Sequence, residues 1–294
     1  TSFVFAQNSN AQKTNVVVVI DAGHGGTDPG HLPNDSIFLP EKDLNLKIAK
    51  YLGGYIKKYL QNVTVIYTRT DDTFPSLNDR VAIANNINAD YFISIHCNGF
   101  ENTAIHGTET YVHSMSLTKS VRFAKRIESQ FSTRAGRHSR GVKDKDDLRH
   151  SLQVLKYTNM TSVLVECGYV TNTKEARYLN STYGQEILAS GVFRAFRAQI
   201  KSDFPSISFV KSQNNSSSSD KRYWVQIMSS KQPVDPKGSR FNAISTGVTR
   251  KKLQTSSPYK YIYLVGDFNS KAEAKESLEG IRSSGFSDAY IVYR

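Results

Sequence analysis

The sequence predicts an α/β fold with a mostly parallel, twisted sheet flanked by helices, followed by a small α+β module with an antiparallel sheet. Before residue 206, β-branched apolar runs alternate with segments of helical spacing, which is typical of strand–helix–strand units. The polar run SQNNSSSSDKR then has the composition of a flexible linker. After it, three strand-like runs surround one helical pattern, which favours a separate small module.

The first elements follow from their local patterns. Residues 16–20 are a continuous β-branched run, as in a strand that is covered on both faces. Apolar residues at helical spacing then predict an amphipathic helix that starts near Asp43. Residues 63–68 predict the next strand. A helix is predicted over residues 77–86, because Ser76 is a suitable N-cap.

The next elements complete the first domain. Two buried strands are predicted at 91–96 and 162–166, where apolar runs end in a polar side chain. Residues 109–113 alternate between polar and apolar and predict an edge strand. Helical spacing predicts helices over 117–131 and 185–200, and we expect the second to pack against the sheet.

The last part of the chain has its own pattern. Strands are predicted at 223–228, 261–268 and 287–293, with an irregular stretch after the first. A helix is predicted to start after Ser270, which forms a capping-box pattern with a glutamate three residues later. The expected domains are an N-terminal tail (1–14), a first domain (15–205), a linker (206–221) and a second domain (222–294). The tail reads either as the remnant of a secretory signal or as a disordered terminus.

Composition restricts the classes of partner. The 38 Lys and Arg residues against 26 Asp and Glu give a net charge of +12, which favours an anionic partner. Nucleic acid is disfavoured because zinc-finger spacing, a phosphate loop and a clustered basic helix are all missing. No run reaches the ~18 apolar residues of a membrane helix, so stable membrane insertion is not expected.

Four separated segments each carry one metal-binding or acid/base side chain at the end of an apolar run or the start of a helix. His24, His96 and Glu166 follow or end predicted strands, and Glu41 precedes a predicted helix. Loops at the carboxyl ends of strands form the ligand crevice of open α/β sheets, so we expect these side chains to meet there. Two histidines and a carboxylate can hold zinc with one position open, as in hydrolases. Glu166 would then carry the proton.

Each of these residues alone has a structural explanation. A single histidine at a strand end is more often structural than a ligand, and Glu41 could simply stabilise the helix N-terminus. Glu166 is harder to explain in this way, because a carboxylate in an apolar strand is costly unless it is paired or bound to metal. The combination therefore favours a metal site.

The motifs IDAGHGGTDPG, PEKDLNLKIAKYL, ADYFISIHCNG, RGVK and VLVECGYVTN follow one another in the first domain. By these motifs the domain resembles the zinc-dependent N-acetylmuramoyl-L-alanine amidases of bacterial cell walls, of the type 3 family that includes septal enzymes. The resemblance implies that His24, Glu41 and His96 bind one Zn²⁺ ion and that Glu166 is the catalytic glutamate. It also implies hydrolysis of the amide between the lactyl group of N-acetylmuramic acid and L-alanine of the stem peptide.

The resemblance further implies peptidoglycan as the partner, an activator protein as a candidate partner, and a periplasmic or secreted location at the division septum. Arg140 in RGVK could bind substrate carboxylates bidentately, and His106 is a second candidate for substrate contact. Some septal relatives carry a helical insertion that plugs the zinc site. The stretch 107–166 leaves little room for one, so we expect an open site.

The two cysteines, Cys97 and Cys167, directly follow His96 and Glu166. Neighbouring side chains of a strand point to opposite faces, so both thiols should point away from the metal. Buried free thiols are the favoured interpretation. A disulfide between the two strands stays open.

The second domain resembles the SPOR domain, a peptidoglycan-binding module that prefers glycan strands without stem peptides. The resemblance rests on YKYIYLVGDFNSKAEAKESLEGIRSSGFSDAYIV and on an initial YWVQI, whereas PVDPKGSRFNAISTGVTRKK replaces the usual first helix. Strand alternation predicts that Trp224, Gln226, Tyr261 and Tyr263 form an exposed glycan-binding face. Aromatic packing that merely stabilises the sheet is the alternative.

The leading hypothesis is thus a secreted zinc amidase that is held at denuded, septal wall by its second domain. A wall-binding adaptor with an inactive amidase-like domain is the alternative from a non-enzyme class. Another zinc hydrolase, such as a peptidase or deacetylase, is a third.

Overall fold

The computed structural model describes residues 13–209, 222–254 and 259–293. These residues fall into two compact units, one on each side of the predicted linker. The predicted tail, except for residues 13 and 14, and most of the predicted linker lie outside the described residues.

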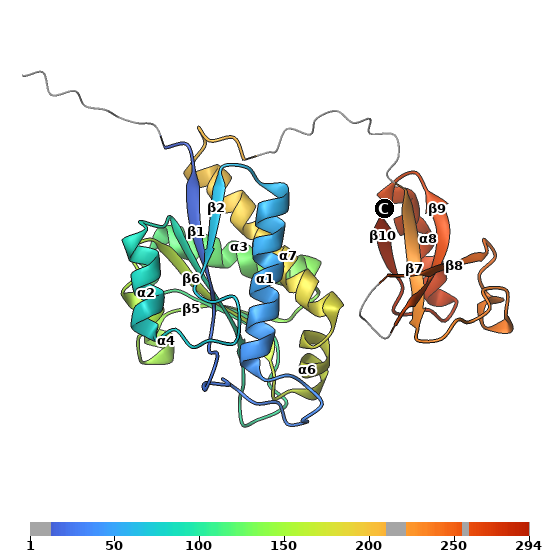
Figure 1. The fold of residues 1–294 in the computed structure, drawn as a ribbon, viewed down its shortest axis with the longest axis horizontal. Coiled ribbons are helices and arrows are strands. Elements are labelled where there is room, and N and C mark those ends of the chain that lie inside the picture. Colours follow the sequence, from blue (N-terminus) through green and yellow to red (C-terminus); the bar gives the residue numbers. More distant parts are fainter. Residues whose placement is uncertain (1–12, 210–221, 255–258, 294) are drawn as a thin grey trace, which may run out of the picture. The chain divides into compact units, whose positions relative to one another are not determined.

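The first unit is built on a six-stranded sheet with the strand order β2-β1-β3-β6-β4-β5. Neighbouring strands are parallel except β4 and β6, which are antiparallel. The predicted α/β class with a mostly parallel sheet is confirmed. The elements are β1 (Val16–Ala22), α1 (Glu41–Tyr59), β2 (Val63–Tyr67), α2 (Leu77–Asn86), β3 (Tyr91–Asn98), β4 (Thr108–Tyr111), α3 (Thr118–Arg134), β5 (Ser139–Lys143), α4 (Lys145–Leu148), α5 (Gln153–Lys156), β6 (Thr161–Tyr169), α6 (Thr173–Leu179) and α7 (Thr182–Asp203) (Figure 1).

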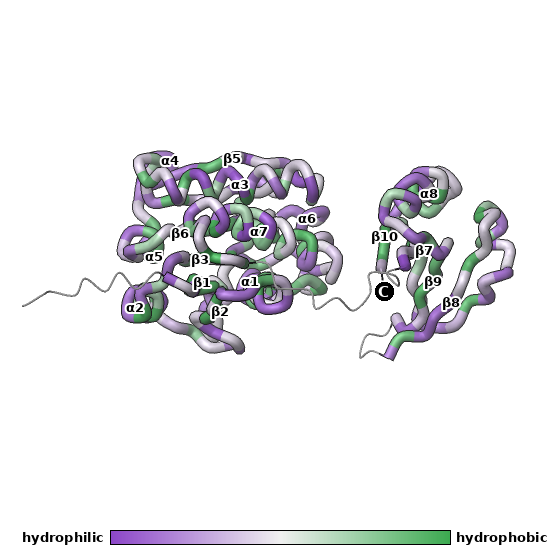
Figure 2. The backbone as a smooth tube through the Cα atoms, turned by 90° about the horizontal axis from the view of Figure 1, so that it is seen from above, coloured by the Kyte–Doolittle hydropathy of each residue, from purple (hydrophilic) through white to green (hydrophobic). Residues whose placement is uncertain are grey.

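Helices cover both faces of this sheet. The larger apolar core lies between one face and the helices α1, α3 and α7. A smaller core on the other face includes residues of α2 and α5. Figure 1 shows α2 and α4 to the left of the strands and α1 and α7 to the right, and Figure 2 shows the same arrangement from above. Because both faces are covered, the central strands are apolar on both sides, as their sequences suggest.

Two predictions for this unit are corrected. The strand predicted at 109–113 is not an edge strand: β4 pairs with β6 on one side and β5 on the other, and β5, formed by SRGVK, lies at the edge. Helix α1 begins at Glu41 rather than near Asp43, directly after Pro40 in an extended conformation. Glu41 therefore belongs to the first turn of the helix. By contrast, α2 starts after Ser76 with the predicted cap.

The larger core of the first unit continues past residue 205, where the first domain was predicted to end. Phe209 is only 2% exposed and, with Ile207, belongs to the larger core. The backbone N–H of Gln61 donates a hydrogen bond to the Phe209 carbonyl at 3.3 Å. Apolar side chains after α7 therefore extend the domain to at least Phe209.

The second unit is a four-stranded antiparallel sheet with the order β10-β7-β9-β8 and one α-helix packed on it. Its elements are β7 (Tyr223–Ser230), a 3-10 turn (Ser239–Phe241), β8 (Val248–Lys252), β9 (Tyr261–Phe268), α8 (Lys271–Ser283) and β10 (Tyr290–Tyr293). Strand β8 lies in the stretch that the sequence left irregular. Its sequence, VTRKK, lacks apolar alternation because it forms an exposed sheet edge.

The predicted exposed aromatic face is wrong for Tyr263. This side chain is 0% exposed, stacks on Phe241 at a centroid distance of 5.4 Å, and belongs to the core beneath the sheet. Its hydroxyl accepts a hydrogen bond from the Val234 backbone N–H at 2.6 Å. Tyr261 is half-buried against the same core. Both residues therefore lie on the core side of β9, and only Trp224 and Gln226 of the predicted face lie elsewhere.

Each helix in the described part of the chain is too short or too polar to span a lipid bilayer.

Candidate metal centre

His24 is placed by a strained turn at the end of β1. Its φ of 61° is in the left-handed region, and the next two residues, Gly25 and Gly26, have φ of 127° and 52°. Such conformations are rare outside glycine and gather at functional sites. The preceding Gly23 is also required, because a β-carbon there would stand 2.1 Å from the His96 ring.

Two buried arginines hold this turn. The Arg80 guanidinium pairs with the Asp21 carboxylate at 2.6 Å and donates to the His24 carbonyl at 2.8 Å. Arg69 donates to the Gly23 carbonyl at 2.9 Å. Hydrogen bonds to backbone carbonyls fix the chain directly, so the position of His24 does not depend on side-chain packing alone.

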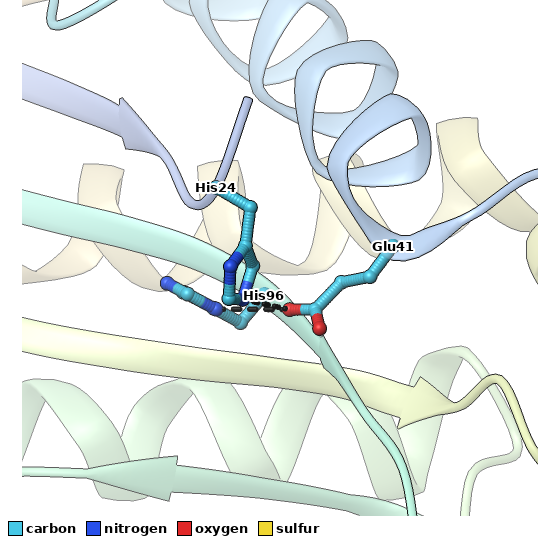
Figure 3. A group of neighbouring side chains, drawn as sticks. All are labelled: His24, Glu41 and His96. Atoms are coloured by element: carbon cyan, nitrogen blue, oxygen red, sulfur yellow. Dashed lines mark hydrogen bonds and ion pairs between the residues drawn. The ribbon is translucent and has the colours of Figure 1, made fainter. Parts of the chain in front are cut away.

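Three side chains from distant parts of the chain meet at one point. His24 comes from the turn after β1, His96 from β3, and Glu41 from the first turn of α1 (Figure 3). Glu41 Oε1 lies 3.2 Å from His24 Nε2 and 2.9 Å from His96 Nδ1. One ligand atom from each residue lies within 4.8 Å of the others. Figure 3 shows the carboxylate and both imidazoles directed toward each other.

This donor set fits a zinc ion. Ligand atoms of a tetrahedral zinc lie roughly 3.4 Å apart, given zinc–ligand distances of about 2.0–2.2 Å. The two Glu41–histidine distances, 3.2 and 2.9 Å, are close to that value. Two imidazoles and one carboxylate are the ligands of several zinc hydrolases, and they leave one position open.

Glu41 is the most buried member of the cluster, with 1% exposure. Its oxygens also accept hydrogen bonds from the Cys97 backbone N–H at 3.1 Å and the His31 backbone N–H at 2.8 Å. Burial alone would raise the pKa of this carboxyl, but the hydrogen bonds from His24, His31 and His96 hold it well below its usual value. Glu41 is therefore ionised and ready to bind a cation.

Asp28 is a functional residue that the sequence analysis missed. Its Oδ2 lies 2.7 Å from Nδ1 of His24, the ring nitrogen that faces away from Glu41. Histidines that bind metals usually donate this second N–H to a carboxylate, which fixes the ring and its tautomer. The signal in the sequence was a carboxylate four residues after a glycine-flanked histidine. His31, which the sequence analysis did not name, is a further partner of Glu41, with its Nδ1 2.9 Å from Glu41 Oε2.

The variant Asp28→Asn should bind zinc about 10- to 100-fold more weakly, the usual cost of losing a carboxylate partner of a ligand histidine. Titration with a zinc-competing chelator would measure this affinity. Asp35→Asn, a change of the same kind at an exposed position of the same loop, serves as the control and should leave the affinity unchanged. An unaltered affinity in Asp28→Asn would show that His24 needs no such partner.

Glu166 lies directly beside the cluster. It is the register partner of His96 on the neighbouring parallel strand, so both side chains lie on the same face of the sheet. Its Oε2 is buried and has no hydrogen-bond partner among the described residues. Burial and the negative charges of Glu41 and Glu109 raise the pKa of Glu166 well above its usual value. A carboxyl with a raised pKa is suited to both taking up and releasing a proton during a reaction.

A cavity of about 290 Å³ opens beside the cluster. It is lined by His24 and His96 together with residues of α2, α5 and β6. No side chain of the stretch 107–166, which the structure describes throughout, forms a hydrogen bond or ion pair with His24, Glu41 or His96. The geometry thus agrees with the expected open site.

The two candidate substrate contacts differ in position. Arg140 lies on β5 and pairs with Glu109, the register partner of Glu166. His106 lies in the loop between β3 and β4, with its ring 5.4 Å from that of His138, and lines a separate cavity of about 690 Å³. That cavity shares no lining residue with the one beside the cluster. The structure therefore does not bring His106 to the cluster.

Cys97 and Cys167 are free, buried thiols. Both belong to the larger core, on the face of the sheet opposite to His96 and Glu166. The favoured interpretation of buried free cysteines is confirmed.

Known proteins share this domain. Residues 18–198 match the family model described as N-acetylmuramoyl-L-alanine amidase. The uncharacterised protein YqiI of Bacillus subtilis (strain 168) is 38% identical over 176 residues, which are 60% of this chain and 80% of YqiI. The N-acetylmuramoyl-L-alanine amidase LytC of the same strain is 34% identical over 196 residues, which are 65% of this chain but only 38% of LytC.

A solved structure agrees with these sequence matches. The crystal structure of an N-acetylmuramoyl-L-alanine amidase from Clostridium difficile 630 is 34% identical and superposes with a TM-score of 0.60. The superposition covers 64% of this chain and 98% of that one. The similarity thus concerns the first unit, and the family match ends before the linker.

Proposed function

Because this chain belongs to the N-acetylmuramoyl-L-alanine amidase family, we propose that it is a zinc-dependent cell-wall hydrolase. Its reaction is hydrolysis of the amide between the lactyl group of N-acetylmuramic acid and L-alanine of the stem peptide in peptidoglycan. The observation that carries this proposal is the meeting of His24, Glu41 and His96 with Glu166 at the neighbouring register position.

In this mechanism His24, Glu41 and His96 would hold the zinc ion. The ion would supply Lewis acidity, which polarises the scissile carbonyl and makes a water molecule more acidic. Glu166 takes the proton from the attacking water and then delivers it to the nitrogen of the leaving amine. Its unpartnered Oε2 supports this role, because none of the described residues competes for that oxygen. Asp28 keeps His24 in the orientation that directs Nε2 toward Glu41.

Mass spectrometry of digested cell wall tests the proposal. An amidase releases peptides with free L-alanine amino termini and leaves the sugars intact. A peptidase would cut within the peptide, and a deacetylase would change the mass of the sugars. An adaptor would release nothing. The expected result is peptides that begin with L-alanine and that form only when zinc is present. Any of the other product patterns would contradict the proposal.

For the second unit we propose binding to glycan strands without stem peptides, in the manner of a SPOR domain. Trp224 and Gln226 support this, since they lie on the sheet face away from the Tyr263 core. Binding there would concentrate the enzyme where wall is being split, so a periplasmic or secreted location at the septum belongs to the same proposal. An activator protein stays a prediction.

A further inference from the structure

One row of side chains continues the metal centre across the sheet. His96 on β3 is the register partner of Glu166 on β6, and Glu166 is the register partner of Glu109 on β4. Direct partners in a ladder place their side chains on the same face. Glu109 therefore follows Glu166 on the side away from the metal ligands.

Glu109 is a buried anion with an unusual number of donors. It is 1% exposed, and its Oε1 accepts hydrogen bonds from Asn98 Nδ2 at 2.8 Å, the Tyr111 hydroxyl at 2.7 Å and the Tyr169 hydroxyl at 3.1 Å. Burial would raise the pKa of this carboxyl, but the hydrogen bonds from Lys143 and Tyr111 lower it. Glu109 thus remains negatively charged, and its buried carboxylate contacts neighbouring protein groups rather than solvent.

Two cations of β5 are held at this anion. Arg140 Nε lies 3.1 Å from Glu109 Oε2, and the Lys143 ammonium contacts the same oxygen. Their side chains are 31% and 28% exposed, so both can reach solvent. Two positive charges meet one negative charge, which leaves one positive charge in excess.

Both cations also keep donors available. Among the described residues Arg140 gives only Nε to a hydrogen bond, out of five N–H groups in a guanidinium. The Lys143 ammonium has three N–H groups, and among the described residues it donates a hydrogen bond only to Glu109. The hydrogen bonds to Glu109 thus use only some of the N–H donors of Arg140 and Lys143. The remaining donors suit a carboxylate, which a guanidinium can bind bidentately.

The direction of the substrate follows from the role of Glu166. Since Glu166 gives its proton to the leaving amine, that amine lies at Glu166 rather than on the far side of the metal. A peptide that leaves Glu166 on the side away from the metal ligands runs toward β4 and β5. Neighbouring strands are about 4.8 Å apart, so β5 lies roughly 10 Å beyond β6. An extended peptide covers about 3.3–3.6 Å per residue, so this distance corresponds to about three residues.

We propose that Arg140 and Lys143 form a subsite for a carboxylate carried by one of the first residues of the leaving peptide. The buried Glu109 carboxylate holds the two cations in place through its ion pairs with them. This subsite would make the enzyme select peptides with a free acidic group near their amino end. The inference rests on the proposed amidase function, because it takes the direction of the peptide from that reaction.

Two synthetic muramoyl-peptides test the proposed subsite. Both carry an acidic residue near the amino end of the peptide. In one substrate this residue has a free carboxylate, and in the other the same group is a carboxamide. The ratio of their kcat/KM values measures selection. The wild-type ratio should favour the carboxylate by about 10- to 100-fold, the range expected for hydrogen bonds to a charged group. Arg140→Gln and Lys143→Gln should each lower this ratio, with the loss confined to the carboxylate substrate.

Lys125→Gln removes one exposed positive charge from α3 and should leave the ratio unchanged. Wild-type enzyme that hydrolyses both substrates equally would overturn the subsite alone. So would variants that lose activity on both substrates by the same factor, because that result indicates a structural role for the cations. Wild-type enzyme that hydrolyses neither substrate would overturn the proposed function and, with it, this inference.

Discussion

Glu166→Gln should lower kcat for amide hydrolysis by about 10²–10⁴-fold, the usual contribution of general acid–base catalysis, while zinc remains bound. The amide has nearly the same size as the carboxyl, so the packing around position 166 is kept. It can no longer take a proton from water or give one to the leaving amine. Zinc content per chain and release of dye from labelled cell wall, measured on the same preparation, would separate the two effects.

Glu186→Gln is a suitable control for this experiment. Glu186 is a carboxyl on α7 whose pKa is also raised by burial, but it does not lie on β6 beside His96, as Glu166 does. Its replacement should leave kcat unchanged. If Glu166→Gln retained near-normal turnover, another group would have to carry the proton, and the assignment of Glu166 would be withdrawn.

Glu41→Gln should weaken zinc binding by more than about 100-fold, because loss of a partner behind a ligand already costs 10- to 100-fold. The amide removes the negative charge to which three histidines are directed. Activity should fall in parallel and recover partly at high zinc concentration. A chelator titration gives the affinity, and dye release at several zinc concentrations gives the recovery.

Asp43→Asn distinguishes this role of Glu41 from a purely structural one. Both carboxylates lie in the first turn of α1, where a negative charge stabilises the helix by about 0.3–1 kcal/mol. Only Glu41 reaches His24 and His96. If the two variants lost zinc affinity equally, the effect would come from the helix N-terminus and not from a ligand.

The sequence predicted the residues of the candidate metal site because their signal is local. His96 and Glu166 end apolar strands, and strand ends of a parallel sheet meet at one edge. Asp28 and His31 do not end an apolar strand, and they meet His24 and Glu41 through the loop after β1, which has left-handed backbone at His24. Loop conformation of this kind has no periodic pattern in the sequence.

The errors in the second unit have a related cause. Strand β9 lies between β7 and β8, and its residues are apolar on both faces. Alternation then shows which residues share a face but not which face is the core. A bulge in β7 between Gln226 and Met228 also changes the register against β9. The face of Tyr263 could therefore be assigned only from the structure.

Anomalous X-ray diffraction at the zinc edge, from crystals grown with one equivalent of zinc, tests the central claim most directly. The account predicts one peak per chain, bonded to His24, Glu41 and His96 at about 2.0–2.2 Å, with the Glu166 carboxyl beside it. A peak at other residues, or no peak at this site, would contradict it.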